Sequence, residues 1–299
     1  MRVSYSPAYV ADIPDHHVFP MKKFSGLCHY LLSQGIIKEK EVMEPSMVDM
    51  ANLFTTHTQR YAHAVWTGEL DRKEERKMGL PWSRSLAIRS RLAVQGTINA
   101  GLMALQDGIA GNLAGGTHHS MPDMGEGFCV YNDVAVAIKV LQQSMWVNKV
   151  LVIDCDVHQG NGTAYIFRDD PRVYTFSIHG EKNYPFKKPP SDYDIGLPDG
   201  TTDQAYHKTL IDAMDRIFEE FNPDLVYYLG GIDPLEMDHF GRLSLSLKGL
   251  RERERIVIEN VTQRNIPLVL LLSGGYAPTV KDTVKAHALM YEVAKEMGF

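Results

Sequence analysis

The sequence places two carboxylates and an imidazole within five consecutive positions, directly after an apolar run. The run spans residues 150–153, and Asp154, Asp156 and His158 follow it. An uninterrupted apolar run of this kind is typical of a strand that is buried on both faces, as in a parallel sheet. In open parallel sheets, ligands bind beyond the carboxyl ends of the strands. The pattern Asp-x-Asp-x-His therefore predicts a metal site here, although by itself it also fits a structural role.

Two later apolar runs are also followed by polar side chains that could act in a site. The run at 224–229 leads through a Gly-Gly pair to Asp233, and the run at 267–272 leads through another Gly-Gly pair to Tyr276. Parallel strands bring their carboxyl ends to one edge of a sheet, so we expect these side chains to converge with the first motif. The glycines allow the backbone to pass close to a bound group.

Three of these residues form a candidate set of metal ligands. Asp156, His158 and Asp233 supply two carboxylates and one imidazole and leave a coordination position open, which is typical of a catalytic metal. A divalent ion held there would acidify water and polarise a carbonyl group. The oxygen-rich ligand set is hard enough for Fe2+ to compete with Zn2+.

A His-His pair that follows a third Gly-Gly sequence could supply the acid–base chemistry. His118 and His119 would act as general base and acid near neutral pH. Tyr276 could donate a hydrogen bond to a developing oxyanion. Asp154 and Asn161 are suited to orienting the two imidazoles.

Each of these features also has a structural explanation. A His-His pair often lies in a solvated loop, Asp233 could cap a helix, and Tyr276 could be a half-buried aromatic residue. Their co-occurrence at strand ends favours a functional site. We treat eight further histidines as structural or exposed: His16, His17, His57, His63, His179, His207, His239 and His287.

The chain is expected to form one α/β domain over residues 1–299, with three αβα layers and a mainly parallel central sheet, because helical and strand patterns alternate from residue 132 onward. The charge run at 69–77 is expected to be a solvated surface segment. Gly180–Gly200 is expected to be a long functional loop.

The apolar patterns also predict the individual elements. The expected strands are one near residue 3 and those at 149–153, 173–178, 224–229 and 267–272. The expected helices are 25–37, 47–66 with an interruption, 85–105, 133–145, 163–167, 203–220, 250–262 and a last one to about 297.

Bulk properties exclude several protein classes. The chain has 299 residues, 44% of them hydrophobic, and a net charge of −6, which gives no electrostatic reason to expect nucleic-acid binding. Cys28, Cys129 and Cys155 are scattered, which argues against a disulfide framework. The N-terminal residues lack the apolar core of a signal peptide, and no run is long enough for a membrane span. We therefore expect a cytoplasmic protein without a membrane partner; nothing in the sequence selects a monomer over an oligomer.

Five ordered motifs over roughly residues 15–280 resemble the zinc-dependent histone deacetylases and their bacterial relatives, which share the arginase/deacetylase fold. The class IV branch is the most similar, in a bacterial version. The motifs are Gly115-Gly116-Thr117-His118-His119, Gly127-Phe128-Cys129-x-Tyr131-Asn132-Asp133, Ile153-Asp154-x-Asp156-x-His158-Gln159-Gly160-Asn161-Gly162, Gly231-x-Asp233-x-Leu235-Glu236-x-Asp238 and Ser273-Gly274-Gly275-Tyr276.

The resemblance implies a role for each matched residue. Asp156, His158 and Asp233 would bind zinc, and Tyr276 would hold the acyl carbonyl against the metal. His119 would be the general base and then the general acid, with His118 tuning the site electrostatically. Further residues would line the substrate tunnel or its mouth: Gly127, Phe128, Tyr184, Phe240, Gly274 and Gly275. A structural K+ would be bound by Asp154 and Ser177, together with the backbone carbonyls of Asp156, His158 and Ile178.

Three positions depart from the family pattern. Asn161 stands where class I enzymes carry Asp, so His119 should be less basic than in class I; class II and class IV members share the Asn. Thr117 replaces a Trp that is common among relatives, and this could leave room at the foot of the tunnel for acyl groups longer than acetyl. Phe240 lies at the mouth, where other members have Met or Leu and acetylpolyamine deacetylases carry an acidic residue.

The resemblance favours hydrolysis of N-ε-acyl-lysine in a protein or peptide. Deacetylation of a small acyl-amine such as an acetylpolyamine is an alternative, and Phe240 argues against it. Arginase-like hydrolysis would need a second metal, for which the sequence offers no ligands. A module that only binds acyl-lysine would be expected to have lost a ligand or Tyr276, and neither is lost.

Overall fold

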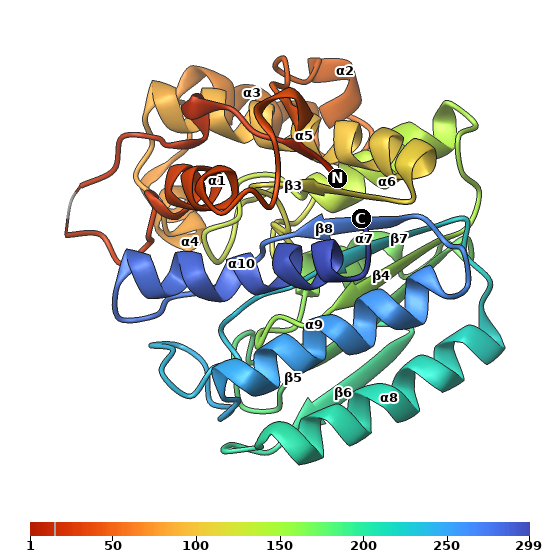
Figure 1. Cartoon of the computed structure of the whole chain (residues 1–299). Coiled ribbons are helices and arrows are strands. Elements are labelled where there is room, and N and C mark those ends of the chain that lie inside the picture. Colours follow the sequence, from red (N-terminus) through yellow and green to blue (C-terminus); the bar gives the residue numbers. More distant parts are fainter. Residues whose placement is uncertain (15) are drawn as a thin grey trace.

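A central sheet lies between two layers of helices in the computed structural model, which describes residues 1–14 and 16–299 (Figure 1). Within these residues, eight strands form one sheet in the order β2-β1-β3-β8-β7-β4-β5-β6, and all neighbouring strands are parallel. The predicted α/β architecture is confirmed. The strands are β1 (Arg2–Ser4), β2 (Val42–Met43), β3 (Ile109–Asn112), β4 (Val150–Asp154), β5 (Val173–Gly180), β6 (Tyr193–Leu197), β7 (Leu225–Leu229) and β8 (Leu268–Leu271).

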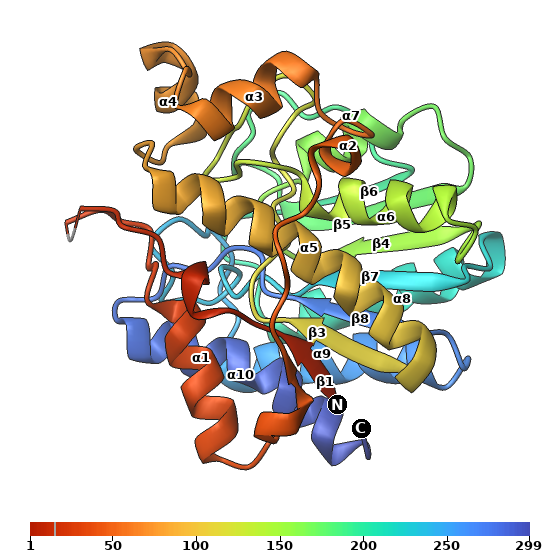
Figure 2. The same ribbon diagram turned by 90° about the horizontal axis from the view of Figure 1, so that it is seen from above.

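The helices pack in two groups (Figures 1 and 2). Helices α1, α10, α9 and α8 contact one another in that order along one face, and α5 contacts α6 and α3 on the other. The α-helices are α1 (Lys23–Ser33), α2 (Met50–Leu53), α3 (Gln59–Thr67), α4 (Arg72–Met78), α5 (Arg84–Asp107), α6 (Asp133–Gln143), α7 (Asn161–Phe167), α8 (Asp203–Glu220), α9 (Leu247–Thr262) and α10 (Val280–Glu296), and short 3₁₀ helices span Pro7–Tyr9 and Glu39–Glu41.

Four neighbouring central strands end at the same level. Asp154 of β4 lies opposite Leu229 of β7, which lies opposite Leu271 of β8, and Leu271 lies opposite Asn112 of β3. All residues of these four strands are buried. The loops that carry the candidate site residues therefore leave the sheet side by side, at its carboxyl edge.

Local signals explain where the helices begin and end. The side chain of Ser83 caps α5 by accepting a hydrogen bond from Leu86 N, and Gly108 ends this helix with φ of 85°. Asp71 and Glu74 form a capping box at the start of α4, and Gly79 ends it with φ of 79°. The charge run at 69–77 thus lies at the surface, as predicted, but it is helical.

Three strands were missed from the sequence. The segment 180–200 was predicted to be a loop throughout, and this is wrong because it contains β6. This strand lies at the edge of the sheet, pairs only with β5, and its residues are mostly exposed or half-buried, so it needs no apolar run. Strand β3 has the sequence Ile-Ala-Gly-Asn, with one large apolar residue, and β2 has only two residues.

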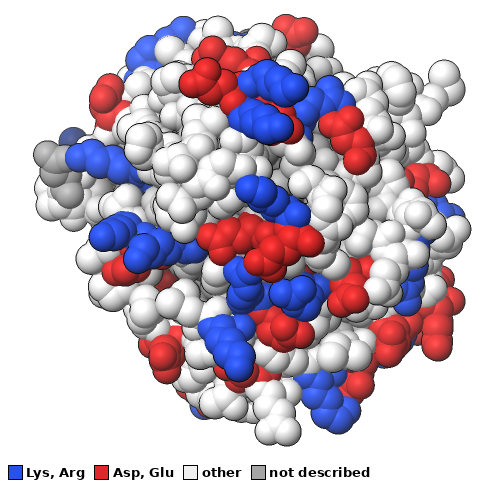
Figure 3. Space-filling view, in the orientation of Figure 1, with Lys and Arg blue, Asp and Glu red and all other residues white. Residues whose placement is uncertain are grey.

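The surface carries charges of both signs. Lys and Arg side chains alternate with Asp and Glu over the face shown in Figure 3. In the part of the chain that the structure describes, no helix has both the length and the apolar character that a membrane span requires.

A buried cation connects two of the central strand ends. The Arg253 guanidinium of α9 is fully buried, and its Nη1 donates to the carbonyl oxygens of Cys155 at 3.1 Å and Gly231 at 2.6 Å. Its Nη2 pairs with the Glu254 carboxylate at 2.5 Å, which also accepts from the Tyr228 hydroxyl at 2.5 Å. Arg253 thereby holds the backbone just before Asp156 and just before Asp233.

We predict that Arg253→Met destabilises the protein by about 3–5 kcal/mol, because it leaves Glu254 as an unpaired buried charge. Urea unfolding followed by circular dichroism measures the change. Arg255→Met is the matched control, since Arg255 is only partly buried and pairs with Glu252 and Glu296 at the surface. The control should change stability by less than about 0.5 kcal/mol, and equal losses in both variants would refute the structural role.

Candidate active site

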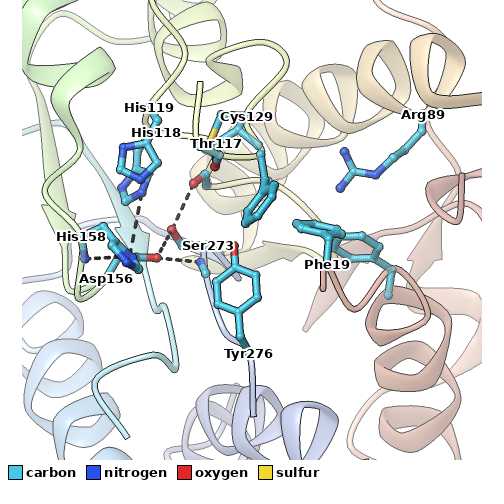
Figure 4. A pocket seen from close by; sticks show the side chains of 16 residues that line it. Phe19, Arg89, Thr117, His118, His119, Cys129, Asp156, His158, Ser273 and Tyr276 are labelled. Carbon is cyan, nitrogen blue, oxygen red and sulfur yellow. Dashed lines mark hydrogen bonds and ion pairs between the residues drawn. The ribbon is translucent and has the colours of Figure 1, made fainter. Parts of the chain in front are cut away.

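The three candidate metal ligands lie together at the carboxyl ends of β4 and β7. Figure 4 shows two of them, Asp156 and His158. One ligand atom each of Asp156, His158 and Asp233 lies within 4.8 Å of the other two. His158 Nδ1 is 3.0 Å from Asp156 Oδ1 and 3.2 Å from Asp233 Oδ2. Two oxygen donors and one nitrogen donor at such distances fit a divalent metal, and three protein ligands leave room for water or substrate.

The loop after β8 fixes the orientation of the Asp156 carboxylate. Asp156 Oδ2 accepts hydrogen bonds from Ser273 Oγ at 2.8 Å and from Gly274 N at 2.6 Å. Ser273 has φ of 54°, a conformation that non-glycine residues adopt at some energetic cost. A Cβ on Gly274 would lie 2.3 Å from Asp233 Oδ2 and 2.6 Å from Asp156 Oδ2, so only glycine fits between the carboxylates. Hydrogen bonds of this kind orient metal ligands and tune their affinity.

The two predicted histidines lie beside the ligands with different partners. His118 Nδ1 is 2.6 Å from Asp154 Oδ2, and His119 Nδ1 is 2.6 Å from Asn161 Oδ1. The two imidazole centroids are 4.1 Å apart, and both side chains are buried. The predicted pairing of each imidazole with its own polar partner is therefore present in the geometry.

These partners give the two imidazoles opposite pKa shifts. Burial alone would lower the pKa of His118, but the Asp154 and Asp156 carboxylates outweigh it and raise the pKa to about 9. Burial, and then the positive charge on neighbouring His118, hold the pKa of His119 well below its ordinary value. Near neutral pH His118 is therefore protonated and His119 is neutral, which is the form that can accept a proton.

Tyr276 faces the two histidines, Asp156 and His158 from the other side of the cavity (Figure 4). Its backbone N donates to Asp238 Oδ2 at 2.6 Å, so Asp238 positions the residue. Burial raises the pKa of the Tyr276 phenol well above its ordinary value, and the hydroxyl keeps its proton. It is therefore available as a hydrogen-bond donor.

Four of the six predicted tunnel residues line one cavity of about 300 Å³. Gly127, Phe128, Tyr184 and Phe240 contribute to its wall, together with His158 and other site residues. Gly127 has φ of 55°, and a Cβ there would lie 2.5 Å from His119 Cδ2. Phe128 also has a positive φ, of 65°, and its ring centroid lies 5.7 Å from that of Tyr276. A side chain at position 127 would therefore displace the His119 imidazole.

A smaller chamber of about 40 Å³ continues behind the ligands. Thr117, Gly274 and Tyr276 line it, and so do Phe19 and Arg89, which the sequence analysis did not single out. Arg89 is buried in α5, where its Nε donates to Tyr9 O at 3.1 Å. A charged residue on the apolar face of a predicted helix was the signal that could have identified it.

Four other predicted residues lie on β4, on β5 and in the loop after β8. Asp154 pairs in register with Ser177 of β5, Ile178 follows in the same strand, and Asp154 and Ser177 both line a cavity of about 10 Å³. Gly275 is packed against Ile232 instead of lining either substrate cavity described above.

The sequence analysis also missed a carboxylate next to the site. Glu126 Oε1 accepts from Asn161 Nδ2 at 3.2 Å and from the Tyr184 hydroxyl, and Glu126 Oε2 is 2.9 Å from Lys77 Nζ. Its partners come from distant parts of the sequence, so no local pattern indicates them.

Comparison with known proteins agrees with this geometry. Residues 17–291 match the histone deacetylase domain. Histone deacetylase 2 of Arabidopsis thaliana is 30% identical over 299 residues, which cover 95% of this chain and 77% of that protein. An uncharacterized protein of Picosynechococcus is 42% identical over 295 residues, which cover 99% of this chain and 98% of the relative.

The fold is also that of a solved relative. The crystal structure of an HDAC homolog complexed with SAHA matches with a TM-score of 0.83 at 25% identity, covering 99% of this chain and 84% of that chain. The match of the domain and of the structure extends over almost the whole chain. The chain therefore belongs to the histone deacetylase family.

Proposed function

We propose that residues 1–299 form one catalytic domain that hydrolyses the N-ε-acyl amide of an acylated lysine in a protein or peptide. The observation that carries this proposal is the arrangement of acid–base groups around the ligand set. Neutral His119 and the Tyr276 hydroxyl lie on different sides of Asp156 and His158 (Figure 4), and His119, His158 and Tyr276 all line the tunnel. A carbonyl carbon between these groups would meet a base on one side and a hydrogen-bond donor on the other.

The proposed metal is Zn2+, with Fe2+ as an alternative, held by Asp156, His158 and Asp233. When bound, such an ion lowers the pKa of water and polarises the acyl carbonyl. The donor set fits either ion, because it combines two hard oxygen ligands with an imidazole.

The protein groups would move the protons of the reaction. The His119 imidazole accepts a proton from the attacking water as the new C–O bond forms. The Tyr276 hydroxyl donates a hydrogen bond to the carbonyl oxygen, where negative charge develops. His119 then transfers its proton to the nitrogen as the C–N bond breaks, which releases a free amine and a carboxylate. Protonated His118, paired with Asp154, keeps positive charge beside the developing negative charge.

The tunnel suits the apolar part of a lysine side chain. Phe128, Tyr184 and Phe240 supply aromatic walls against which methylene groups can pack, at about 0.8 kcal/mol per buried CH₂. Lys77 also lines this cavity, and its ammonium group is paired with Glu126. The absence of an acidic group at Phe240 supports a peptide substrate over an acetylpolyamine.

The chamber behind the ligands bears on the acyl group. Its volume is only about 40 Å³, which favours the two-carbon acetyl group over a longer acyl chain. The Thr117 hydroxyl lies within hydrogen-bond distance of Tyr131 O and of Asp133 Oδ1 and donates its single proton to one of them, so it is already paired. Acetyl-lysine is therefore the first substrate to test, and octanoyl- and myristoyl-lysine test the longer acyl groups that the small Thr117 suggests.

We also propose a structural K+ site beside the catalytic group. Asp154 and Ser177 would bind the ion together with the carbonyl oxygens of Asp156, His158 and Ile178. The shared cavity of Asp154 and Ser177 supports this assignment. A potassium ion there would connect the carboxyl end of β4, which carries Asp154, to the neighbouring strand β5.

Metal content provides the first test. Purified wild-type protein loaded with Zn2+ should retain one ion per chain after dialysis, measured by elemental analysis, and Asp233→Asn should retain almost none. Ser273→Ala removes a donor to Asp156 and should weaken zinc affinity roughly 10- to 100-fold. Asp224→Asn is the control, because Asp224 accepts from Asn148 N and Lys149 N at the amino end of the sheet. Full zinc retention by Asp233→Asn would rule out the ligand assignment.

Turnover of acyl-lysine peptides provides the second test. We expect Tyr276→Phe to lower kcat about 10²- to 10³-fold and His119→Ala about 10²- to 10⁴-fold, since each removes a group that acts in the transition state. Tyr30→Phe and His63→Ala are matched controls on distant parts of the surface. Peptides with acetyl, octanoyl and myristoyl groups are compared at equal concentration. Equal rates for wild type and both site variants would contradict the mechanism, and cleavage of the acetyl peptide alone would exclude longer acyl groups.

A further inference from the structure

Glu126 connects the base of the site to the tunnel wall. It lies in the turn before α6, is 6% exposed, and its backbone exchanges hydrogen bonds with Cys129 at 3.0 and 2.9 Å. Its carboxylate accepts from Asn161 Nδ2 and from the Tyr184 hydroxyl, and pairs with Lys77 Nζ. Three groups from α7, α4 and the segment before β6 thus meet on one buried carboxylate.

This contact determines how the Asn161 amide is oriented. A carboxylate can only accept hydrogen bonds, so the amide must direct its NH₂ group toward Glu126 and its Oδ1 toward His119. A rotation of the amide by 180° would place Oδ1 against the carboxylate oxygen at the present 3.2 Å, where two acceptors repel each other. The Lys77 ammonium lies 2.9 Å from the other carboxylate oxygen.

The amide orientation in turn determines the tautomer of His119. Because Asn161 Oδ1 can only accept, His119 Nδ1 must carry the proton and donate it across the 2.6 Å contact. The other ring nitrogen, Nε2, then keeps its lone pair. With the amide reversed, Nδ1 would accept and Nε2 would carry the proton, and the imidazole could no longer take a proton from water.

We propose that Glu126 is a positioning residue that fixes the Asn161 amide and thereby holds His119 in the tautomer that leaves Nε2 free to act as the base. The part of this proposal that concerns turnover rests on the function proposed above, whereas the part that concerns the tautomer does not. An Asp at position 161 would fix the imidazole without help, because both of its oxygens are acceptors. An Asn needs a second residue to select one of its two orientations, and Glu126 is the residue that contacts its NH₂ group.

The tautomer can be measured directly. Long-range ¹H–¹⁵N correlation spectra of protein labelled with ¹⁵N-histidine distinguish an Nδ1–H from an Nε2–H imidazole, and His119→Ala identifies the signals. Wild type should show the Nδ1–H form at His119. Glu126→Gln should show a mixture, because the new amide can accept from or donate to Asn161. Glu292→Gln is the matched control: Glu292 also pairs with a tyrosine hydroxyl, that of Tyr30 at 3.2 Å, and with a cation, Arg251 at 2.9 Å.

Kinetics and a rescue variant complete the test. We expect Glu126→Gln to lower kcat roughly 10- to 1,000-fold, less than the about 10⁴-fold loss seen when a triad histidine is held in the wrong tautomer. The double variant Glu126→Gln/Asn161→Asp should recover the Nδ1–H signal, because the new carboxylate fixes His119 by itself. Its kcat should recover at alkaline pH, since that carboxylate also favours the protonated form of the ring. A merely structural role of Glu126 would show no such coupling in the double-mutant cycle.

The outcomes separate the two proposals. An unchanged Nδ1–H signal in Glu126→Gln, or no recovery in the double variant, would overturn the role of Glu126 whether or not the protein turns over acyl-lysine. If wild type cleaves no peptide, the proposed function fails while the spectra still decide the tautomer. If Glu126→Gln does not fold, the double variant, in which the amide faces a carboxylate again, carries the comparison with wild type and with Asn161→Asp.

Discussion

The site depends on burying three carboxylates close together. Asp154 is 3% exposed and Asp156 and Asp233 are fully buried. Removing one such charge from water costs several kcal/mol unless hydrogen bonds and opposite charges compensate for it. Asp154 has the His118 imidazole at 2.6 Å, Asp156 has Ser273 and Gly274, and Asp233 has the backbone N of Val157 at 2.8 Å. These donors come from different loops, and they can meet only because β3, β8, β7 and β4 are neighbours that end at one level.

The need to place hydrogen-bond donors against these buried carboxylates also explains the positive φ angles around the site. In the described part of the chain, four non-glycine residues have a positive φ, and two of them, Phe128 and Ser273, line the chamber behind the ligands. Each such conformation costs of order 1–3 kcal/mol, and it persists where the surrounding contacts require it. Ser273 directs its Oγ to Asp156, and Phe128 directs its ring toward Tyr276. Buried Arg253 adds a second constraint from α9, since it holds the carbonyl groups of Cys155 and Gly231.

The sequence predicted the structure well where polar ligand residues directly follow an apolar strand. The strand at 150–154 and the pattern behind it predicted both the sheet and the Asp156–His158 pair, because a buried strand and a strand-end ligand are both local features. Prediction failed where structure depends on distant partners. Strand β3 is stabilised by β1, β8 and α5 instead of by its own composition. Glu126 and Tyr184 are 58 positions apart and lie in segments without periodic pattern, so their contact becomes visible only after folding.

The two neighbouring imidazoles have partners of different charge, and this difference has a physical reason. With a carboxylate against each ring, both imidazoles would tend to become protonated, although their centroids are only 4.1 Å apart. A neutral amide at Asn161 leaves His119 unprotonated beside protonated His118. It gives up the orientation that an acceptor-only carboxylate provides, because an amide can present either a donor or an acceptor. Glu126 restores that orientation from one residue farther away, at 3.2 Å from the amide nitrogen and in contact with Lys77. The negative charge is therefore kept in the network but is moved away from the ring that must stay neutral.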